Sequence, residues 1–182
     1  MLFRSSTARR VPSADGEPVD GSRQRAIVAI AIVSGVVALD QLTKVWAVAR
    51  LDDGPISVFG QDVELRLSRN RGSAFSLFQG FTPLLAVLAV VLAVLLVRAL
   101  RRTDDMWMVV ALALVLGGAT GNLIDRMVRD PGLLRGAVID FVRVDGWPTF
   151  NVADAAITIG AILLVVRALF GGREERTQPE PT

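Results

Sequence analysis

Two aspartates at the ends of apolar stretches are the residues best suited to chemistry in this sequence. Asp125 follows Asn122 by three positions near the end of one stretch, and Asp154 follows Asn151 by three positions at the start of another. A spacing of three places both side chains of each pair on one face of a helix. On two neighbouring membrane-spanning helices joined outside the membrane, the two Asn–Asp pairs are expected to converge at one depth.

Two carboxyl groups held together where the dielectric constant is low cannot both ionise easily, so they share one proton. The ionised aspartate then takes a proton from water, and the protonated one polarises a carbonyl group, as in an aspartic protease. The chain contains no Cys and no His, which excludes thiolate nucleophiles, Ser-His-Asp catalysis and imidazole-ligated zinc. An aspartate pair is the simplest hydrolytic site left, and no metal or cofactor is expected.

Each of these residues also has a structural interpretation. Asn151 can cap the helix that follows it. Asp125 can pair with the adjacent Arg126 at the membrane interface. Asp154 has no basic residue in the twelve positions that follow it, so it needs a partner from another part of the chain.

A second candidate site involves the only lysine. Asp40 and Lys44 are four positions apart inside an apolar stretch, so they share a helix face and can neutralise each other. The alternative is a Ser/Lys peptidase with Lys44 as base and Ser73 or Ser76 as nucleophile. That alternative leaves Asp154 unexplained, so we favour a supporting role for Asp40 and Lys44.

The segment from residue 70 to residue 75 lies just before another apolar stretch. Its Asn, Gly and Ser residues are typical of a turn. Asn70 and Gly72, next to Ala74 and Phe75, also suit the wall of a pocket for an extended peptide.

Four long apolar stretches must position these residues, in a chain that is 52% hydrophobic. About 20 apolar residues span a bilayer, and the composition predicts an all-α membrane protein with four transmembrane helices. Gly117 and Gly121 have the spacing that lets helices approach closely. The stretches cover residues 26–49, 81–97, 106–124 and 152–170.

The loops between the stretches predict a small extracytoplasmic β-sheet. Val63, Leu65 and Leu67 alternate with polar residues, which is the period of a half-buried strand. Residues 56–59 are the expected antiparallel partner of 63–68, and residues 138–144 are a third candidate strand.

The arginines predict the orientation in the membrane. Eleven arginines fall at the two ends of the chain, in residues 4–25 and 167–176, and in the short loop around residues 98–102, against eight on the other side. This asymmetry puts both termini in the cytoplasm. The net charge is only +2 and the basic residues are scattered, so no nucleic-acid partner is expected. We interpret residues 1–22 and 171–182 as disordered cytoplasmic tails around one four-span domain, residues 23–170. Cleavage of the first span as a signal peptide is disfavoured by its internal charges.

Five blocks in order resemble bacterial lipoprotein signal peptidase, the signal peptidase II family. The resemblance covers residues 40–157 and all four stretches. The blocks are Asp40-Gln41-x-Thr43-Lys44, Asn70-x-Gly72-x-Ala74-Phe75, Gly117-Gly118-x-x-Gly121-Asn122-x-x-Asp125-Arg126, Val138-x-Asp140-Phe141 and Phe150-Asn151-x-Ala153-Asp154.

The resemblance implies an aspartic endopeptidase of the bacterial plasma membrane. Its substrates would be lipid-modified prolipoproteins, cut just before the cysteine that carries diacylglycerol, and the enzyme is expected to be monomeric in contact with membrane lipid. Carried over by motif, the catalytic pair would be Asp125 and Asp154. The resemblance gives the remaining motif residues substrate-binding or site-supporting roles: Asn70, Gly72, Asn122, Arg126, Asp140, Asn151, Asp40 and Lys44.

Other classes of protein remain open from the residues alone. A proton-relay or transporter subunit could use Asp40, Lys44 and Asp154, but such a role predicts polar residues spread through the membrane depth. The acidic residues instead gather at the outer level. A structural lipid-binding protein would lack cleavage activity, which an assay can decide.

Overall fold

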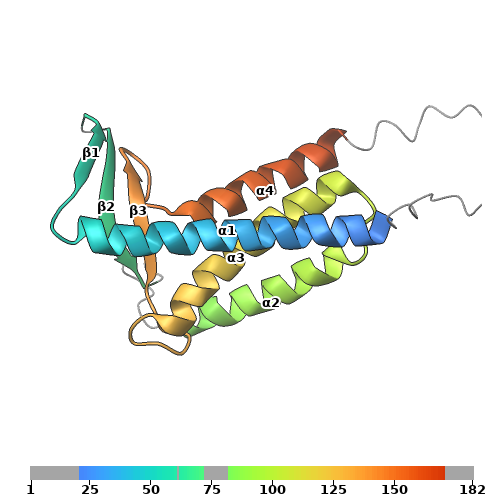
Figure 1. Cartoon of the computed structure of the whole chain (residues 1–182), viewed down its shortest axis with the longest axis horizontal. Helices are drawn as coiled ribbons and strands as arrows, with labels where there is room; N and C mark the ends of the chain where they lie inside the picture. Colours follow the sequence, from blue (N-terminus) through green and yellow to red (C-terminus); the bar gives the residue numbers. More distant parts are fainter. Residues whose placement is uncertain (1–20, 61, 72–81, 171–182) are drawn as a thin grey trace, which may run out of the picture.

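The computed structural model describes residues 21–60, 62–71 and 82–170. Four helices pack side by side, and a small sheet closes one end of the bundle (Figure 1). Both ends of the described chain and the loop between α2 and α3 lie at the opposite end (Figure 1). The helices are α1 (Gly21–Leu51), α2 (Thr82–Leu100), α3 (Met106–Val128) and α4 (Val152–Phe170), and the strands are β1 (Ile56–Phe59), β2 (Val63–Asn70) and β3 (Val138–Val144).

All four helices are long and apolar enough to span a membrane. Their lipid-facing surface consists of large apolar side chains such as Leu88, Val91 and Ile162, each at least half exposed. Such a surface is stable only in an apolar solvent. The predicted four-span helical architecture with a small sheet is therefore confirmed. The first helix begins at Gly21, two residues before the predicted domain boundary, and the remaining tail residues lie outside the described chain.

Helix α3 is the centre of the bundle, and α1, α2 and α4 all pack against it. Glycines make the closest approaches. Gly117 faces Val36 of α1, and Gly118 faces the Ala153 carbonyl and Ile157 of α4. The packing role expected of Gly117 and Gly121 is confirmed, because an added methyl group would lie 2.9 Å from Val36 Cβ at Gly117 and 2.6 Å from Asp40 Oδ2 at Gly121.

Replacing Gly118 with Ala should destabilise the fold. The added methyl group would overlap the Ala153 carbonyl and lie 2.7 Å from Ile157 Cγ1, and overpacking of this kind costs about 1–3 kcal/mol. Gly35→Ala is the matched control, because nothing lies within 4 Å of its added methyl group. Thermal melting in detergent should show a lower Tm for Gly118→Ala and an unchanged or higher Tm for Gly35→Ala. Equal melting of the two variants would contradict this packing.

The sheet has the order β1-β2-β3 with antiparallel neighbours. Ile56 pairs with Leu65, which confirms the predicted hairpin. Ser68 pairs with Asp140, so β3 runs along the far edge of β2. One face of the sheet covers the end of α1, where Ala47 and Leu51 pack against Ile139 and Phe141.

The start of α4 is tied to β3 by main-chain hydrogen bonds. Val142 and Phe150 exchange N–H···O bonds of 2.9 and 3.0 Å. This bridge brings the first turn of α4 beside β3 and beside the last turns of α3, where the predicted site residues lie.

Candidate active site

A buried cluster of charges joins α1 to the end of α3. Asp40 and Lys44 are fully buried, and Lys44 Nζ lies 2.8 Å from Asp40 Oδ2. Lys44 Nζ also lies 2.8 Å from Asp125 Oδ2 and donates to Asn122 Oδ1 at 3.0 Å. Arg129 Nε contacts Asp125 Oδ1 at 2.6 Å. Two carboxylates therefore face two cations, which is how charges persist away from water.

Amide groups complete the hydrogen bonding of this cluster. The main-chain N–H of Ala153 donates to Asp40 Oδ1 at 3.0 Å, and that of Ile139 donates to Asp125 Oδ2 at 3.2 Å. Gln41 Nε2 donates to Asp40 Oδ2 at 3.1 Å. Both carboxylates are thus held by α4 and β3 as well as by their cations, so the cluster fastens the sheet and the helices together.

The predicted pairing of Asp40 with Lys44 is confirmed. Asp125 does not rely on Arg126, its expected interface partner, but pairs with Lys44 and Arg129. Sequence reasoning missed Arg129, although its spacing of four from Asp125 on one helix face was a usable signal.

Asp154 sits in the first turn of α4, where it shares a reciprocal cap with Asn151. The main-chain N–H of Asp154 donates to Asn151 Oδ1 at 2.9 Å, and the main-chain N–H of Asn151 donates to Asp154 Oδ2 at 3.3 Å. This is the capping-box arrangement, in which each side chain satisfies an amide that the helix leaves unpaired. The predicted capping role of Asn151 is confirmed, and it fixes the direction of the Asp154 carboxyl group.

Asn151 connects Asp154 to a second acidic residue, Asp140 of β3. Asn151 Nδ2 donates to Asp140 Oδ1 at 2.7 Å, and Asn70 Nδ2, from the end of β2, donates to Asp140 Oδ2 at 3.0 Å. Asp140 is 2% exposed, whereas Asp154 is half-buried. One asparagine therefore binds both carboxyl groups.

The electrostatic environment separates the roles of the acidic residues. Burial raises the pKa of Asp140 from 3.8 to about 6, and repulsion from Asp154 adds to the rise, although hydrogen bonds from Asn70 and Asn151 oppose it. No cation contacts Asp140 within hydrogen-bonding distance in the described chain. Asp140 therefore keeps its proton up to a higher pH than an exposed aspartate does, to about pH 6.

Asn122 and Arg126 of α3 lie between the ion cluster around Lys44 and the acidic residues bound by Asn151. Asn122 Nδ2 donates to Asp154 Oδ1 at 2.8 Å, while its Oδ1 accepts from Lys44. Arg126 Nη1 donates to the Asn122 main-chain oxygen at 3.0 Å, and its charge is attracted by Asp154, Asp125 and Asp140. Arg126 Nε is buried and has no hydrogen-bond partner among the residues that the structure describes.

The structure departs from the pairing of Asp125 with Asp154 that the sequence predicts. Both oxygens of Asp125 are directed at Lys44, Arg129 and a main-chain amide. The carboxyl group that shares a partner with Asp154 belongs instead to Asp140. The physical reason is the position of Asp125 one turn beyond Asn122. There its carboxylate contacts Lys44 and the main-chain N–H of Ile139.

Two further expectations concern this region. Gly72 lies outside the described residues, so its predicted place in the site has no structural account. Within the described parts of the chain, no three acidic side chains are grouped so as to hold a metal ion.

Comparisons with known proteins agree with the five sequence blocks. The family model described as Signal peptidase (SPase) II matches residues 32–170. The lipoprotein signal peptidase of Rhodococcus jostii (strain RHA1) is 46% identical over 168 residues, which is 92% of this chain and 85% of the relative. That of Mycobacterium tuberculosis (strain H37Rv) is 44% identical over 155 residues, 85% of this chain and 76% of the relative.

A solved structure agrees as well. A bacterial membrane enzyme determined by the in meso method at 1.9 Å resolution has a TM-score of 0.69 and 29% identity, over 78% of this chain and 92% of that chain. The described fold, the buried polar cluster and these similarities lead to one conclusion: the chain belongs to the signal peptidase II family.

Proposed function

We propose that this membrane peptidase removes signal peptides from prolipoproteins, cutting before the cysteine that carries diacylglycerol. The family match and the lipoprotein signal peptidases at 41–46% identity support this substrate. The observation that carries the chemistry is the pair of carboxyl groups bound by one asparagine, Asp140 and Asp154. No cofactor is needed for this reaction.

The proposed dyad is Asp140 and Asp154 rather than Asp125 and Asp154. In the singly protonated form of the pair, Asp140 holds the proton and polarises the scissile carbonyl group, while ionised Asp154 accepts a proton from the attacking water. The elevated pKa of Asp140 supports this division of roles. Asp154 is the more exposed of the two, which suits a group that must meet water.

The neighbouring polar residues have positioning roles in this proposal. Asn151 and Asn122 orient the Asp154 carboxyl group, and Asn70 orients that of Asp140. Arg126 places a buried positive charge and an unused N–H beside the dyad. Such a donor can bind the oxygen of a substrate peptide and favour the negative charge that develops in the tetrahedral intermediate.

The contacts of Lys44 weigh against the Ser/Lys mechanism. Its ammonium group donates to Asp40, Asp125 and Asn122, so all three of its protons are engaged. A nitrogen enclosed by these three partners has no position left for the hydroxyl group of a serine nucleophile. Ser73 and Ser76, the nucleophiles of that alternative, lie outside the described residues.

Cleavage of a purified precursor tests the function directly. The protein in detergent should shorten a diacylglyceryl-modified precursor on a gel. It should not cleave a precursor whose acceptor cysteine is replaced by Ser and which therefore carries no lipid. A folded protein that cleaves neither precursor would overturn the function, and one that cleaves both equally would overturn the requirement for the lipid.

The proposed orientation places both termini in the cytoplasm and the sheet and dyad near the outer face, and the arginine asymmetry supports this orientation. We also propose that the protein acts as a monomer. Asp53→Cys, between α1 and β1, should react with an impermeant thiol reagent on intact cells, and Asp104→Cys, between α2 and α3, should not. The natural chain has no Cys, so background labelling is absent. The reverse labelling pattern would contradict the orientation.

A further inference from the structure

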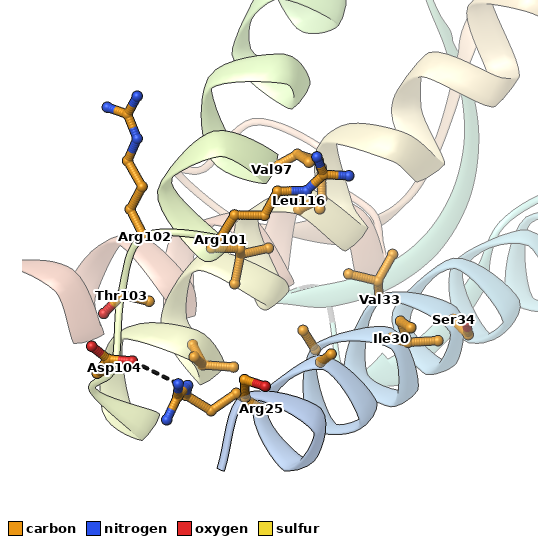
Figure 2. Close-up of a pocket in the computed structure, with 15 residues that line it drawn as sticks. Arg25, Ile30, Val33, Ser34, Val97, Arg101, Arg102, Thr103, Asp104 and Leu116 are labelled. Atoms are coloured by element: carbon orange, nitrogen blue, oxygen red, sulfur yellow. Dashed lines mark hydrogen bonds and ion pairs between the residues drawn. The ribbon is translucent and has the colours of Figure 1, made fainter. Parts of the chain in front are cut away.

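A cavity of about 630 Å³ lies between α1 and the ends of α2 and α3, at the end of the bundle away from the sheet (Figure 2). Its inner wall is apolar and includes Ile30, Val33 and Leu116. Its volume is in the range of small-molecule sites. It is remote from the dyad, which lies beside the sheet.

The rim of the cavity is positively charged. It carries Arg25, Arg101 and Arg102 against one acidic residue, Asp104. Arg25 Nη2 contacts Asp104 Oδ1 at 2.6 Å, and Asp104 is the only acidic residue on the rim among those that the structure describes. The guanidinium groups of Arg101 and Arg102 make no ion pair with any residue that the structure describes. A complementary ligand is therefore anionic.

Arg101 is the arginine that lies across the cavity. Figure 2 shows its side chain extending from the α2–α3 loop toward Val97 and Leu116, whereas Arg102 points away from the apolar wall. A guanidinium group so placed presents several N–H donors, in a geometry suited to a phosphate group.

The depth of the cavity matches the boundary between lipid headgroups and hydrocarbon. Helix α2 has 19 residues, a length of roughly 28 Å at about 1.5 Å per residue, which is close to the thickness of the hydrocarbon layer. The α2–α3 loop at its end therefore lies at the headgroup level. The arginines face the phosphates, and the apolar wall faces the acyl chains.

We propose that this cavity binds one anionic phospholipid of the surrounding leaflet. Its phosphate would lie at Arg101, and the upper part of an acyl chain would lie against Ile30 and Val33. Charge complementarity favours this occupant over the signal peptide of a substrate, because the basic N-terminal region of a signal peptide would be repelled by the rim. It favours an anionic lipid over a zwitterionic one for the same reason.

The lipid would link the ends of α1 and α2, which both pack mainly against α3. Helices α1 and α2 both pack on α3, and the cavity separates their ends. A bound lipid bridges this gap, so it should stabilise the native state as any ligand specific for that state does.

Lipid retention by the purified full-length protein tests the proposal without reference to cleavage. In native mass spectrometry from detergent, phosphatidylglycerol should bind in preference to phosphatidylcholine and should raise the Tm. Arg101→Gln should weaken phosphatidylglycerol binding about fivefold. Ala29→Leu, which places a larger side chain in the apolar part of the cavity, should weaken phosphatidylglycerol binding as well. Arg23→Gln removes the same charge from an exposed position that does not line the cavity, and it should bind phosphatidylglycerol like the natural protein.

Each other result would overturn the proposal. Equal binding of the two lipids, or equal loss in Arg101→Gln and Arg23→Gln, would show general surface attraction. Stabilisation by inorganic phosphate equal to that by phosphatidylglycerol would show an anion site without a lipid chain. Displacement of phosphatidylglycerol by a basic signal-peptide fragment would assign the cavity to the substrate. Precursor cleavage by Arg101→Gln should stay normal, because the cavity does not contact the dyad.

Discussion

Asp140→Asn and Asp154→Asn should each lower the single-turnover rate of precursor cleavage by about three orders of magnitude or more. An amide keeps the size of the carboxyl group but cannot exchange the proton that activates water and polarises the carbonyl. The cleavage rate of the double variant should be only slightly lower than that of either single variant, because the two groups act as one unit. Folding is checked by thermal melting, and substrate retention by co-purification with the uncleaved precursor.

The thermal stability of the variants distinguishes the Asp140–Asp154 dyad from the Asp125–Asp154 pair that the sequence predicts. The pKa of Asp140 is 3.8 when unfolded and about 6 when folded. The stabilising effect of its protonation is complete below about pH 4 and is lost as the pH rises through about 6. At pH 7.5 the ionised, 2% exposed side chain therefore costs stability, and Asp140→Asn removes that cost. We expect its Tm to exceed that of the natural protein by a few degrees at pH 7.5, and the difference to disappear near pH 4.

Asp125→Asn should have the opposite effect on stability. It leaves Lys44 and Arg129 without their buried counter-charge, so its Tm should fall at pH 7.5. Near-normal cleavage by well-folded Asp140→Asn, together with an inactive but stable Asp125→Asn, would contradict the proposed Asp140–Asp154 dyad. That result would assign the catalytic role to Asp125.

The second large effect is expected at Lys44. Lys44→Met keeps the length of the side chain but removes the charge that faces Asp40 and Asp125, both fully buried. Breaking a buried pair by removing one partner costs about 3–5 kcal/mol, because the remaining charges lose compensation. The variant should give a low yield of folded protein and a Tm many degrees below that of the natural chain.

Two companions sharpen this test. Combining Lys44→Met with Asp40→Asn should recover part of the loss, because Asp125 retains Arg129 while Asp40 becomes neutral. Asp52→Asn is the matched control: it breaks an exposed pair, Asp52 to Arg69 at 3.3 Å, which is worth at most about 1 kcal/mol. A Lys44→Met protein that melts like Asp52→Asn would contradict the structural role of the buried cluster.

Much of the fold could be predicted from the sequence because its determinants are local. A bilayer requires long apolar runs, and the four helices coincide with those runs to within a few residues. The alternation of Val63, Leu65 and Leu67 predicted a strand, and β2 contains all three. The spacing of four between Asp40 and Lys44 predicted an ion pair, and their contact is 2.8 Å. In each case the interacting groups belong to one element or to two adjacent ones.

Which carboxyl group lies with Asp154 was decided by the tertiary structure. Spacing along a helix shows that Asn122 and Asp125 share a face, but it does not show which partners meet that face. In the fold, Lys44 from α1 and an amide from β3 take up Asp125, while the bridge between β3 and Phe150 carries Asp140 to Asn151. The sequence did hold a usable signal, because Asp140 lies between apolar neighbours of a strand, as Asp154 lies in an apolar helix. Residue spacing identified Asp125 and Asp154, whereas Asp140 was named only through the family resemblance. The packing of α1, β3 and α4 separated the ion-paired Asp125 from the two acids that share Asn151. Contacts between elements depend on how their surfaces fit, and residue spacing along one element does not determine that fit.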